Sequence, residues 1–254
     1  MDKQINRYRF GNNPAVVEKR GRARLVKVLL FTVIFFTLLS GVFYGLSSPL
    51  FNLEDVVFQG NQVLGPEELD QAFPYPGGIN IWKVDLARVE KQYTGLPRVA
   101  LAEVERRLPG SLVITLEEKE TVALIPYQGY YYEVALDGTL VGTTSRLPPG
   151  GLPMLTELAG IVYRPGESIA GAEGGSLVIS FLAGMEETAG VISEISAANP
   201  NNLVIITLSG LKIWLGRGEY PEKLSLLPDI MAALPPKEGY LDFRVLEAPA
   251  FVGK

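Results

Sequence analysis

The sequence VLLFTVIFFTLLSGVFYGL, residues 28–46, decides how this chain is organised. It contains no charged residue. At a rise of about 1.5 Å per residue, a helix of this length is about 28 Å long, close to the roughly 30 Å hydrocarbon core of a bilayer. Its apolar residues lie all round the helix instead of along one stripe, as exposure to lipid demands. The stretch therefore predicts a transmembrane helix, which with its flanking residues covers 25–47.

Two other interpretations of this stretch are weaker. A buried core helix rarely runs this long without a polar face. A cleaved signal peptide has an apolar region of about 7–15 residues and then a site of small residues. Here the apolar run is longer, and it leads into Ser47-Ser48-Pro49-Leu50-Phe51, which is a poor cleavage site. We therefore interpret the segment as an uncleaved signal anchor.

The charge distribution predicts the orientation of this anchor. Residues 1–27 hold eight basic and two acidic residues, a net charge of +6, which leaves −11 for the rest of a chain whose total is −5. The basic residues nearest the anchor are Lys19, Arg20, Arg22, Arg24 and Lys27. Positively charged flanks stay on the cytoplasmic side of a membrane. We therefore predict a cell-membrane protein that crosses once, with a cytoplasmic basic tail at 1–24 and an extracytoplasmic body. A nucleic-acid interaction of the tail is disfavoured, because its only aromatic residues are Tyr8 and Phe10.

The composition narrows the possible chemistry. The chain has no Cys and no His, which excludes thiol nucleophiles, disulfides, His/Cys zinc sites and Ser-His-Asp catalysis. Glu117, Glu118 and Glu120 cluster, and paired carboxylates can hydrolyse glycosides. A membrane-anchored cell-envelope glycosidase or lytic transglycosylase is therefore the alternative function. A solvated strand end is the better interpretation of this cluster, so we predict no catalytic, cofactor-binding or metal-binding residue and no cofactor.

Residues 51–120 predict a small domain of the order β-α-α-β-β. A strand at 56–59 precedes a helix at 66–73, and Asp85 can cap a second helix. Two strands, about 99–107 and 112–117, flank a Pro-Gly turn and form a hairpin. Trp82 lies between the two helices beside Ile81, and we expect its ring to form a wall of the core.

Residues 121–245 predict a larger, mixed β-rich domain, followed by a C-terminal tail at 246–254. Asp137-Gly138 between two apolar runs is a strong hairpin signal. Further short strands are expected at 191–195, 203–208, 212–215 and 240–245, with helices near 176–187 and 220–234. The predicted fold class is therefore α+β: one transmembrane helix, a small α+β domain and a larger β-rich domain.

Several short motifs occur in a characteristic order along this chain. They are Gly60-Asn61, Gly78-Ile79-Asn80-Ile81-Trp82, Leu96-Pro97-Arg98-Val99, the run from Val104 to Ile114, Trp214-Leu215-Gly216, Glu222-Lys223-Leu224 and the segment from Gly239 to Arg244. With the basic tail and the anchor before them, they resemble the FtsQ/DivIB family of bacterial cell-division proteins. The resemblance implies a POTRA domain at 51–120 and the family's β domain at 121–245.

The same resemblance implies a function and partners. It suggests a non-enzymatic scaffold of the divisome, enriched at the division septum, that links its partners to septal peptidoglycan synthesis. The implied partners are FtsL and FtsB/DivIC-type proteins, with no nucleic acid and no small-molecule substrate.

The candidate partner-binding residues form the closing strand: Tyr240, Leu241, Asp242, Phe243 and Arg244. As the last expected strand, it should have an outer edge that no later segment covers. Strand alternation predicts Leu241, Phe243 and Val245 in the core and the other side chains outside. The resemblance also implies that FtsB/DivIC-type partners bind here. The alternative is a strand that only completes its own sheet.

Overall fold

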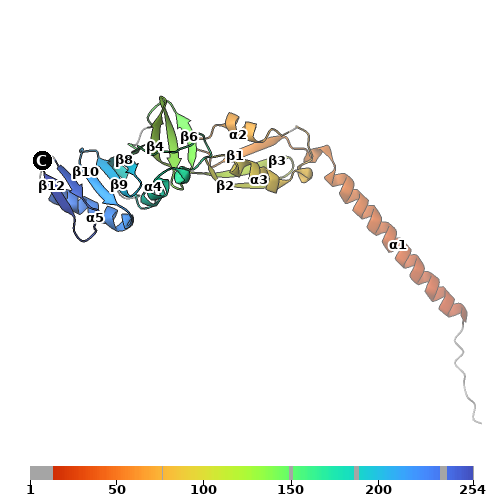
Figure 1. The fold of residues 1–254 in the computed structure, drawn as a ribbon. Coiled ribbons are helices and arrows are strands. Elements are labelled where there is room, and N and C mark those ends of the chain that lie inside the picture. The colour runs from red at the N-terminus through yellow and green to blue at the C-terminus, as the bar shows by residue number, and fades with distance from the viewer. Residues whose placement is uncertain (1–13, 76, 149–150, 186–188, 235–238, 254) are drawn as a thin grey trace, which may run out of the picture. The chain divides into compact units, whose positions relative to one another are not determined.

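The computed structural model describes residues 14–75, 77–148, 151–185, 189–234 and 239–253. The fold is α+β, with one long N-terminal helix followed by a POTRA-like part and a β-rich part, as the sequence predicted (Figure 1). By packing, the described chain divides into two units. The first contains the described residues up to Asp55, those from 77 to Val84, and Arg106–Ser111. The second contains the remaining residues.

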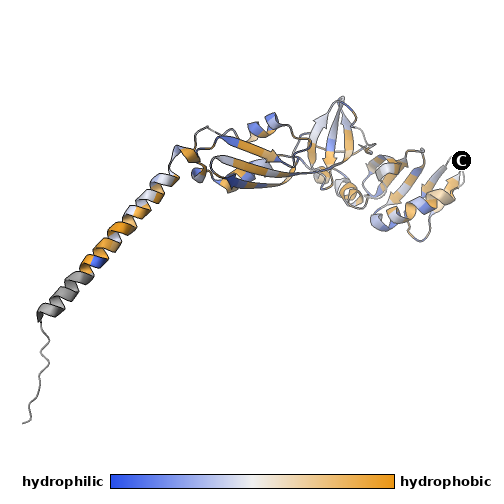
Figure 2. Ribbon diagram, turned by 180° about the vertical axis from the view of Figure 1, so that it is seen from behind, coloured by the Kyte–Doolittle hydropathy of each residue, from blue (hydrophilic) through white to orange (hydrophobic). Residues whose placement is uncertain are grey.

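The long helix α1 (Pro14–Leu46) contains the predicted span. Its segment Leu25–Leu46 is 22 residues long and predominantly apolar, as Figure 2 shows. None of these residues is buried inside the protein. Within it, the hydroxyls of Thr32 and Thr37 donate to the carbonyls of Val28 and Val33, four residues earlier. The polar groups of both threonines are therefore satisfied inside the helix, as a lipid environment requires. Of the predicted basic tail, residues 1–13 lie outside the described part.

The predicted order β-α-α-β-β is present after the span. It consists of β1 (Asp55–Gln59), α2 (Pro66–Ala72), α3 (Leu86–Thr94), β2 (Val99–Arg107) and β3 (Ser111–Glu118). The three strands form a sheet of order β1-β3-β2. Asp85 caps α3, since its carboxylate accepts the N–H of Arg88 at 3.2 Å. Leu69 of α2 and Tyr93 of α3 are fully buried, and the Tyr93 hydroxyl donates to the Leu69 carbonyl.

The expected core position of Trp82 is wrong. The loop between the helices forms a short 3-10 helix, η2 (Ile81–Lys83), which the Asn80 side chain caps by accepting the N–H of Trp82. This turn directs Ile81 inward, with no exposed surface, and leaves Trp82 43% exposed. Two adjacent apolar residues on a tight turn cannot both face the core, and the sequence pattern does not tell which one does.

The β-rich part contains one nine-stranded sheet of order β12-β11-β10-β9-β8-β7-β4-β5-β6. Its strands are β4 (Thr121–Tyr127), β5 (Tyr130–Ala135), β6 (Leu140–Thr144), β7 (Met154–Thr156), β8 (Ile192–Asn199), β9 (Asn202–Thr207), β10 (Lys212–Gly216), β11 (Gly239–Asp242) and β12 (Ala250–Gly253). Two helices accompany it, α4 (Gly175–Leu182) and α5 (Tyr220–Ala233). Short 3-10 helices occur at η3 (Ile169–Gly171) and η4 (Ala189–Val191) in this part, and at η1 (Pro49–Phe51) directly after α1.

The core of this sheet is one apolar cluster to which both helices contribute. Phe181 of α4 and Tyr220 of α5 meet edge to face, with ring centroids 5.6 Å apart. The predicted hairpin at Asp137-Gly138 joins β5 and β6, which pair antiparallel. Gly138 has a φ of 78°, the left-handed conformation that such a turn needs.

The expectation that the closing strand is the last one is wrong. β11 ends at Asp242, and β12 pairs antiparallel along it, with Tyr240 opposite Val252. A strand edge carries unpaired N–H and C=O groups, so an apolar segment within reach tends to satisfy them. The expected tail at 246–254 supplies that segment. Val245, predicted to be buried, is 55% exposed because it lies beyond the strand, in the turn that leads to β12.

Candidate functional site

The exposed side of β10 and β11 carries a cluster of aromatic and charged side chains. The two strands are parallel neighbours, with Lys212 opposite Tyr240 and Trp214 opposite Asp242. The rings of Trp214 and Tyr240 stack with centroids 4.5 Å apart. The Arg244 guanidinium lies 5.4 Å from the Trp214 ring centroid. We call Trp214, Tyr240, Asp242 and Arg244 the aromatic–arginine cluster.

Asp242 and Arg244 form a two-point ion pair within this cluster. Arg244 Nε donates to Oδ1 of Asp242 at 2.8 Å, and Nη2 donates to Oδ2 at 2.6 Å. The hydrogen bond from Arg244 lowers the pKa of the Asp242 carboxyl, and the same contact raises the pKa of the Arg244 guanidinium. Both groups are therefore charged at neutral pH. The pair holds Arg244 against the indole, where a partner can contact both the cation and the aromatic faces.

The five predicted site residues divide between the two faces of the sheet. Leu241 and Phe243 are 1% and 0% exposed and belong to the apolar core. Arg244 is exposed, and Tyr240 and Asp242 are partly exposed. The predicted alternation is confirmed over these five residues. Sequence reasoning missed Trp214 as a site residue, although its position between the buried Ile213 and Leu215 indicates an outward side chain.

A buried lysine forms hydrogen bonds to the backbone beneath this cluster. Lys223 of α5 has no exposed surface, and its Nζ donates to the carbonyls of Leu215 at 2.9 Å, Gly218 at 3.2 Å and Arg244 at 3.1 Å. Burial lowers the pKa of Lys223, while the carboxylate of Glu219, 3.8 Å away, opposes that shift. The ammonium therefore joins the end of β10, the following turn and the segment just after β11. Sequence reasoning placed Lys223 in a predicted helix and in a motif of the family resemblance, but gave it no role at the site.

The edge of the sheet next to the cluster is formed by β12. This strand stands first in the sheet order, so among the described residues no strand pairs with its outer side. Val252 on this strand is 42% exposed. An unpaired edge offers backbone donors and acceptors to an added strand. On this side of the sheet, the open edge among the described residues is therefore that of β12, one strand beyond the one that the sequence indicated.

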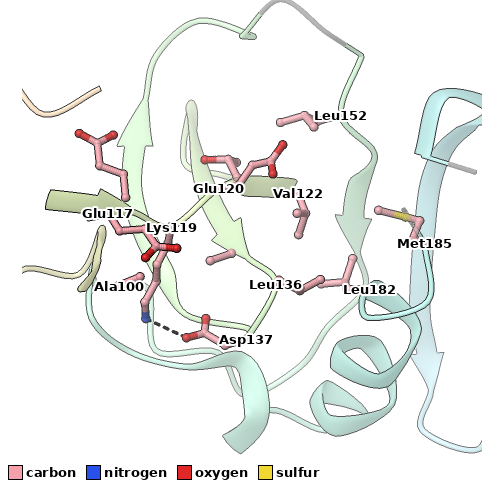
Figure 3. Close-up of a pocket in the computed structure, with 13 residues that line it drawn as sticks. Ala100, Glu117, Lys119, Glu120, Val122, Leu136, Asp137, Leu152, Leu182 and Met185 are labelled. Carbon is pink, nitrogen blue, oxygen red and sulfur yellow. Dashed lines mark hydrogen bonds and ion pairs between the residues drawn. The ribbon is translucent and has the colours of Figure 1, made fainter. Parts of the chain in front are cut away.

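The acidic cluster lines a cavity of about 790 Å³ between β3, β4 and α4 (Figure 3). The Glu118 carboxylate is fully engaged in the fold, since it accepts the backbone N–H groups of Gln62, Val63 and Leu64 at 2.9–3.2 Å. Lys119 binds Asp137 at 2.7 Å, the dashed line in Figure 3. In the described part of the chain, no group of three or more acidic side chains is placed to hold a metal ion. Glu118 therefore serves as a structural acceptor.

Comparisons with known proteins agree with this architecture. Residues 51–119 match the family model for the POTRA domain of FtsQ type, and residues 123–244 match the model for the C-terminal part of the cell-division proteins FtsQ and DivIB. The cell-division protein DivIB of Geobacillus kaustophilus is 24% identical over 224 residues, which cover 87% of this chain and 82% of that protein. FtsQ of Myxococcus fulvus is 29% identical over 195 residues, or 74% of this chain and 67% of the relative.

A solved structure is also similar. The major extracytoplasmic domain of DivIB from Geobacillus stearothermophilus is 21% identical and covers 46% of this chain and 95% of its own, with a TM-score of 0.31. The family assignment rests on the two adjoining family models, which occur in the order expected after an N-terminal apolar helix, and on the relatives that match most of this chain. The chain belongs to the FtsQ/DivIB family of bacterial cell-division proteins.

Proposed function

We propose that this chain is a non-enzymatic scaffold of the divisome that crosses the membrane once and binds FtsL and FtsB/DivIC-type partners at the septum. Through these partners it is linked to septal peptidoglycan synthesis. Its N-terminal tail is cytoplasmic and its POTRA and β domains, at 51–120 and 121–245, are extracytoplasmic. The family supports the role in division, and the charge distribution supports the orientation.

One observation carries the assignment of the partner surface. The aromatic–arginine cluster lies on β10 and β11, directly beside β12, whose outer edge is unpaired among the described residues. A partner strand that adds to β12 gains main-chain hydrogen bonds, and side chains beside it supply specificity. Aromatic and arginine residues are the types that dominate binding energy at interfaces. Anchoring in one membrane plane raises the effective concentration of the partner.

The proposal assigns no catalytic reaction to the acidic cluster at Glu117, Glu118 and Glu120. The carboxylate most central to the acidic cluster, Glu118, is held by three backbone N–H groups. A carboxylate fixed in this way is not placed as the acid or nucleophile of a glycosidase, which needs an open partner across the scissile bond. The full chain, incubated with purified peptidoglycan, should therefore release no muropeptides. Their release would show that the glycosidase or transglycosylase alternative is correct.

The test of the partner surface uses pull-down of FtsL and FtsB/DivIC-type ectodomains by the full chain in detergent. Tyr240→Ala and Arg244→Glu should each weaken capture by roughly tenfold or more, as loss of an interface hot spot does. Tyr130→Ala and Arg146→Glu are the matched controls. Tyr130 is 55% exposed and Arg146 is exposed, and both belong to the β domain but not to the cluster. The controls should bind as the unmodified chain does.

A thermal melt beside each pull-down separates binding from folding. Both cluster side chains point away from the core, so the variants should keep the fold. Tyr240→Ala should lose about 0.5–1.5 kcal/mol of ring stacking, and Arg244→Glu should lose the small contribution of its exposed ion pair with Asp242. If both variants capture the partners as well as the unmodified chain, the closing strand only completes its own sheet. The partner surface would then have to lie elsewhere.

A further inference from the structure

The end of α1 fixes where the membrane surface lies on the first unit. The apolar segment Leu25–Leu46 has 22 residues, which corresponds to about 33 Å of helix, close to the roughly 30 Å hydrocarbon core. A span of this length ends at the boundary between hydrocarbon and headgroups. Leu46, its last residue, therefore lies at that boundary on the side of the POTRA domain.

A hydrogen bond holds a POTRA loop at this same point. The Asn80 side chain donates through Nδ2 to the Leu46 carbonyl at 2.8 Å. That carbonyl is one of those that a helix leaves without an intrahelical partner at its C-terminus. The loop is also joined to the segment after the helix, because Leu53 N–H donates to the Ile79 carbonyl at 2.7 Å. Residues 77–84 are thus tied to the end of the span.

This loop presents a large apolar side chain that the protein itself does not cover. Trp82, two residues after the bonded Asn80, is 43% exposed. Two further apolar residues of the same unit are open, Leu50 at 63% and Leu108 at 51%. Lys83 and Arg107 beside them are exposed as well. We call Leu50, Trp82 and Leu108 the juxtamembrane patch.

Trp82 is held in its exposed position by neighbouring groups. Arg106 lies over the indole, 5.9 Å from its ring centroid. Arg106 is itself fixed by hydrogen bonds from Nε to the Ile81 carbonyl at 2.9 Å and from Nη2 to the Val84 carbonyl at 2.6 Å. Phe51 also packs beside the indole, with ring centroids 6.0 Å apart. The indole is therefore preorganised and loses little freedom when it enters another environment.

We infer that the juxtamembrane patch contacts the lipid headgroup region of the outer leaflet, with Trp82 as its anchor. This inference rests on the proposed membrane span. Tryptophan is enriched at membrane–water interfaces, where an amphipathic ring suits the headgroup level. Lys83 and Arg107 carry the charge that anionic lipid phosphates attract. The loop that closes the POTRA domain is thereby seated on the bilayer at a fixed depth.

The chain offers a direct test, because it has two tryptophans, Trp82 and Trp214. The Trp214→Phe variant leaves Trp82 as the only indole, and Trp82→Phe leaves Trp214 as a matched control in the β domain. Each full-length variant is reconstituted in phosphatidylcholine–phosphatidylglycerol vesicles with and without lipids brominated near the headgroup. Bromolipids should quench Trp82 roughly twofold or more. They should leave Trp214 unchanged, while aqueous iodide should reach Trp214 more readily than Trp82.

Flotation of the vesicles in a density gradient separates two kinds of failure. If the protein floats and Trp82 is as open to iodide and as insensitive to bromolipid as Trp214, the lipid contact is refuted and the span stands. If the protein does not float, the span itself is refuted and the lipid contact with it. If shielding of Trp82 grows with the protein-to-lipid ratio without bromolipid quenching, a second copy covers the patch and the inference is wrong. Asn80→Ala, which removes the tie to Leu46, should reduce the bromolipid quenching in the Trp214→Phe background.

Discussion

Replacing Lys223 by methionine should destabilise the β domain strongly. The side chain has no exposed surface, and its ammonium donates to three carbonyls, those of Leu215, Gly218 and Arg244. Methionine has a similar length but no donor, so Lys223→Met keeps the packing and leaves the three acceptors unpaired. The bond to Leu215 is buried, and the other two are partly open to water.

The size of the effect follows from these three bonds. A hydrogen bond from a charged group contributes about 1.5–3 kcal/mol, and a buried acceptor left unpaired costs about 1–3 kcal/mol. Water can replace the donor at the two partly open carbonyls, and the variant no longer buries an ammonium ion, which offsets part of the loss. We therefore expect a net loss of about 2–4 kcal/mol in the free energy of unfolding.

The measurement is guanidinium unfolding of the full chain in detergent, in a Trp82→Phe background. The fluorescence of Trp214 on β10 then reports the β domain alone. Lys212→Met is the control, because Lys212 is exposed on β10 and its ammonium has no hydrogen bond or ion pair among the described residues. It should change stability by less than about 0.5 kcal/mol. A loss for Lys223→Met no larger than that of Lys212→Met would refute the role of the three carbonyl bonds.

Three further predictions follow from the charges. A reporter active only outside the cytoplasm, fused after Lys254, should be active, and an active reporter at the N-terminus would contradict the orientation. Glu118→Gln should lower stability by about 1–2 kcal/mol through loss of charged hydrogen bonds to the loop at 62–64, whereas the exposed Glu117→Gln should not, in parallel denaturant titrations. Because its folded pKa is depressed, Asp242 contributes stability that is complete above its unfolded pKa near 4 and lost as the pH falls through the folded value. A carboxyl NMR titration of Asp242 should show the low midpoint and its return toward the ordinary value in Arg244→Gln.

Local patterns predicted most of the elements. The hairpin of β2 and β3, the cap at Asp85 and the Asp137-Gly138 turn depend on neighbours in sequence, and all three are present. The helix expected at 220–234 is also present, and it continues to Ala233 through Pro228. A proline inside a helix costs about 3 kcal/mol or more. Leu224 and Leu227, both fully buried, offset that cost by packing against the core on the preceding turn.

The features that the sequence did not show depend on contacts between distant segments. No local pattern reveals that residues 250–253 return along β11, because a strand of four residues has too few side chains to display a period. Likewise, the residue of η2 that turns inward depends on the cap by Asn80, whose amide donates in turn to the carbonyl at the end of α1. A pattern of residues cannot predict either of these contacts.

The parallel pairing of β10 with β11 explains why the candidate surface and its support occur together. The register that sets Trp214 opposite Asp242 brings the indole within reach of Arg244, and it carries the chain after β11 along the last residues of β10. The carbonyls of Leu215 and Arg244 then lie close enough for one ammonium, that of Lys223, to bind both. The same strand pairing therefore positions two groups of Arg244: its guanidinium on the outer face and its carbonyl toward Lys223. It follows that loss of Lys223 should weaken both partner capture and stability strongly, whereas loss of the Arg244 side chain should weaken capture and cost only the small stability of its exposed ion pair with Asp242.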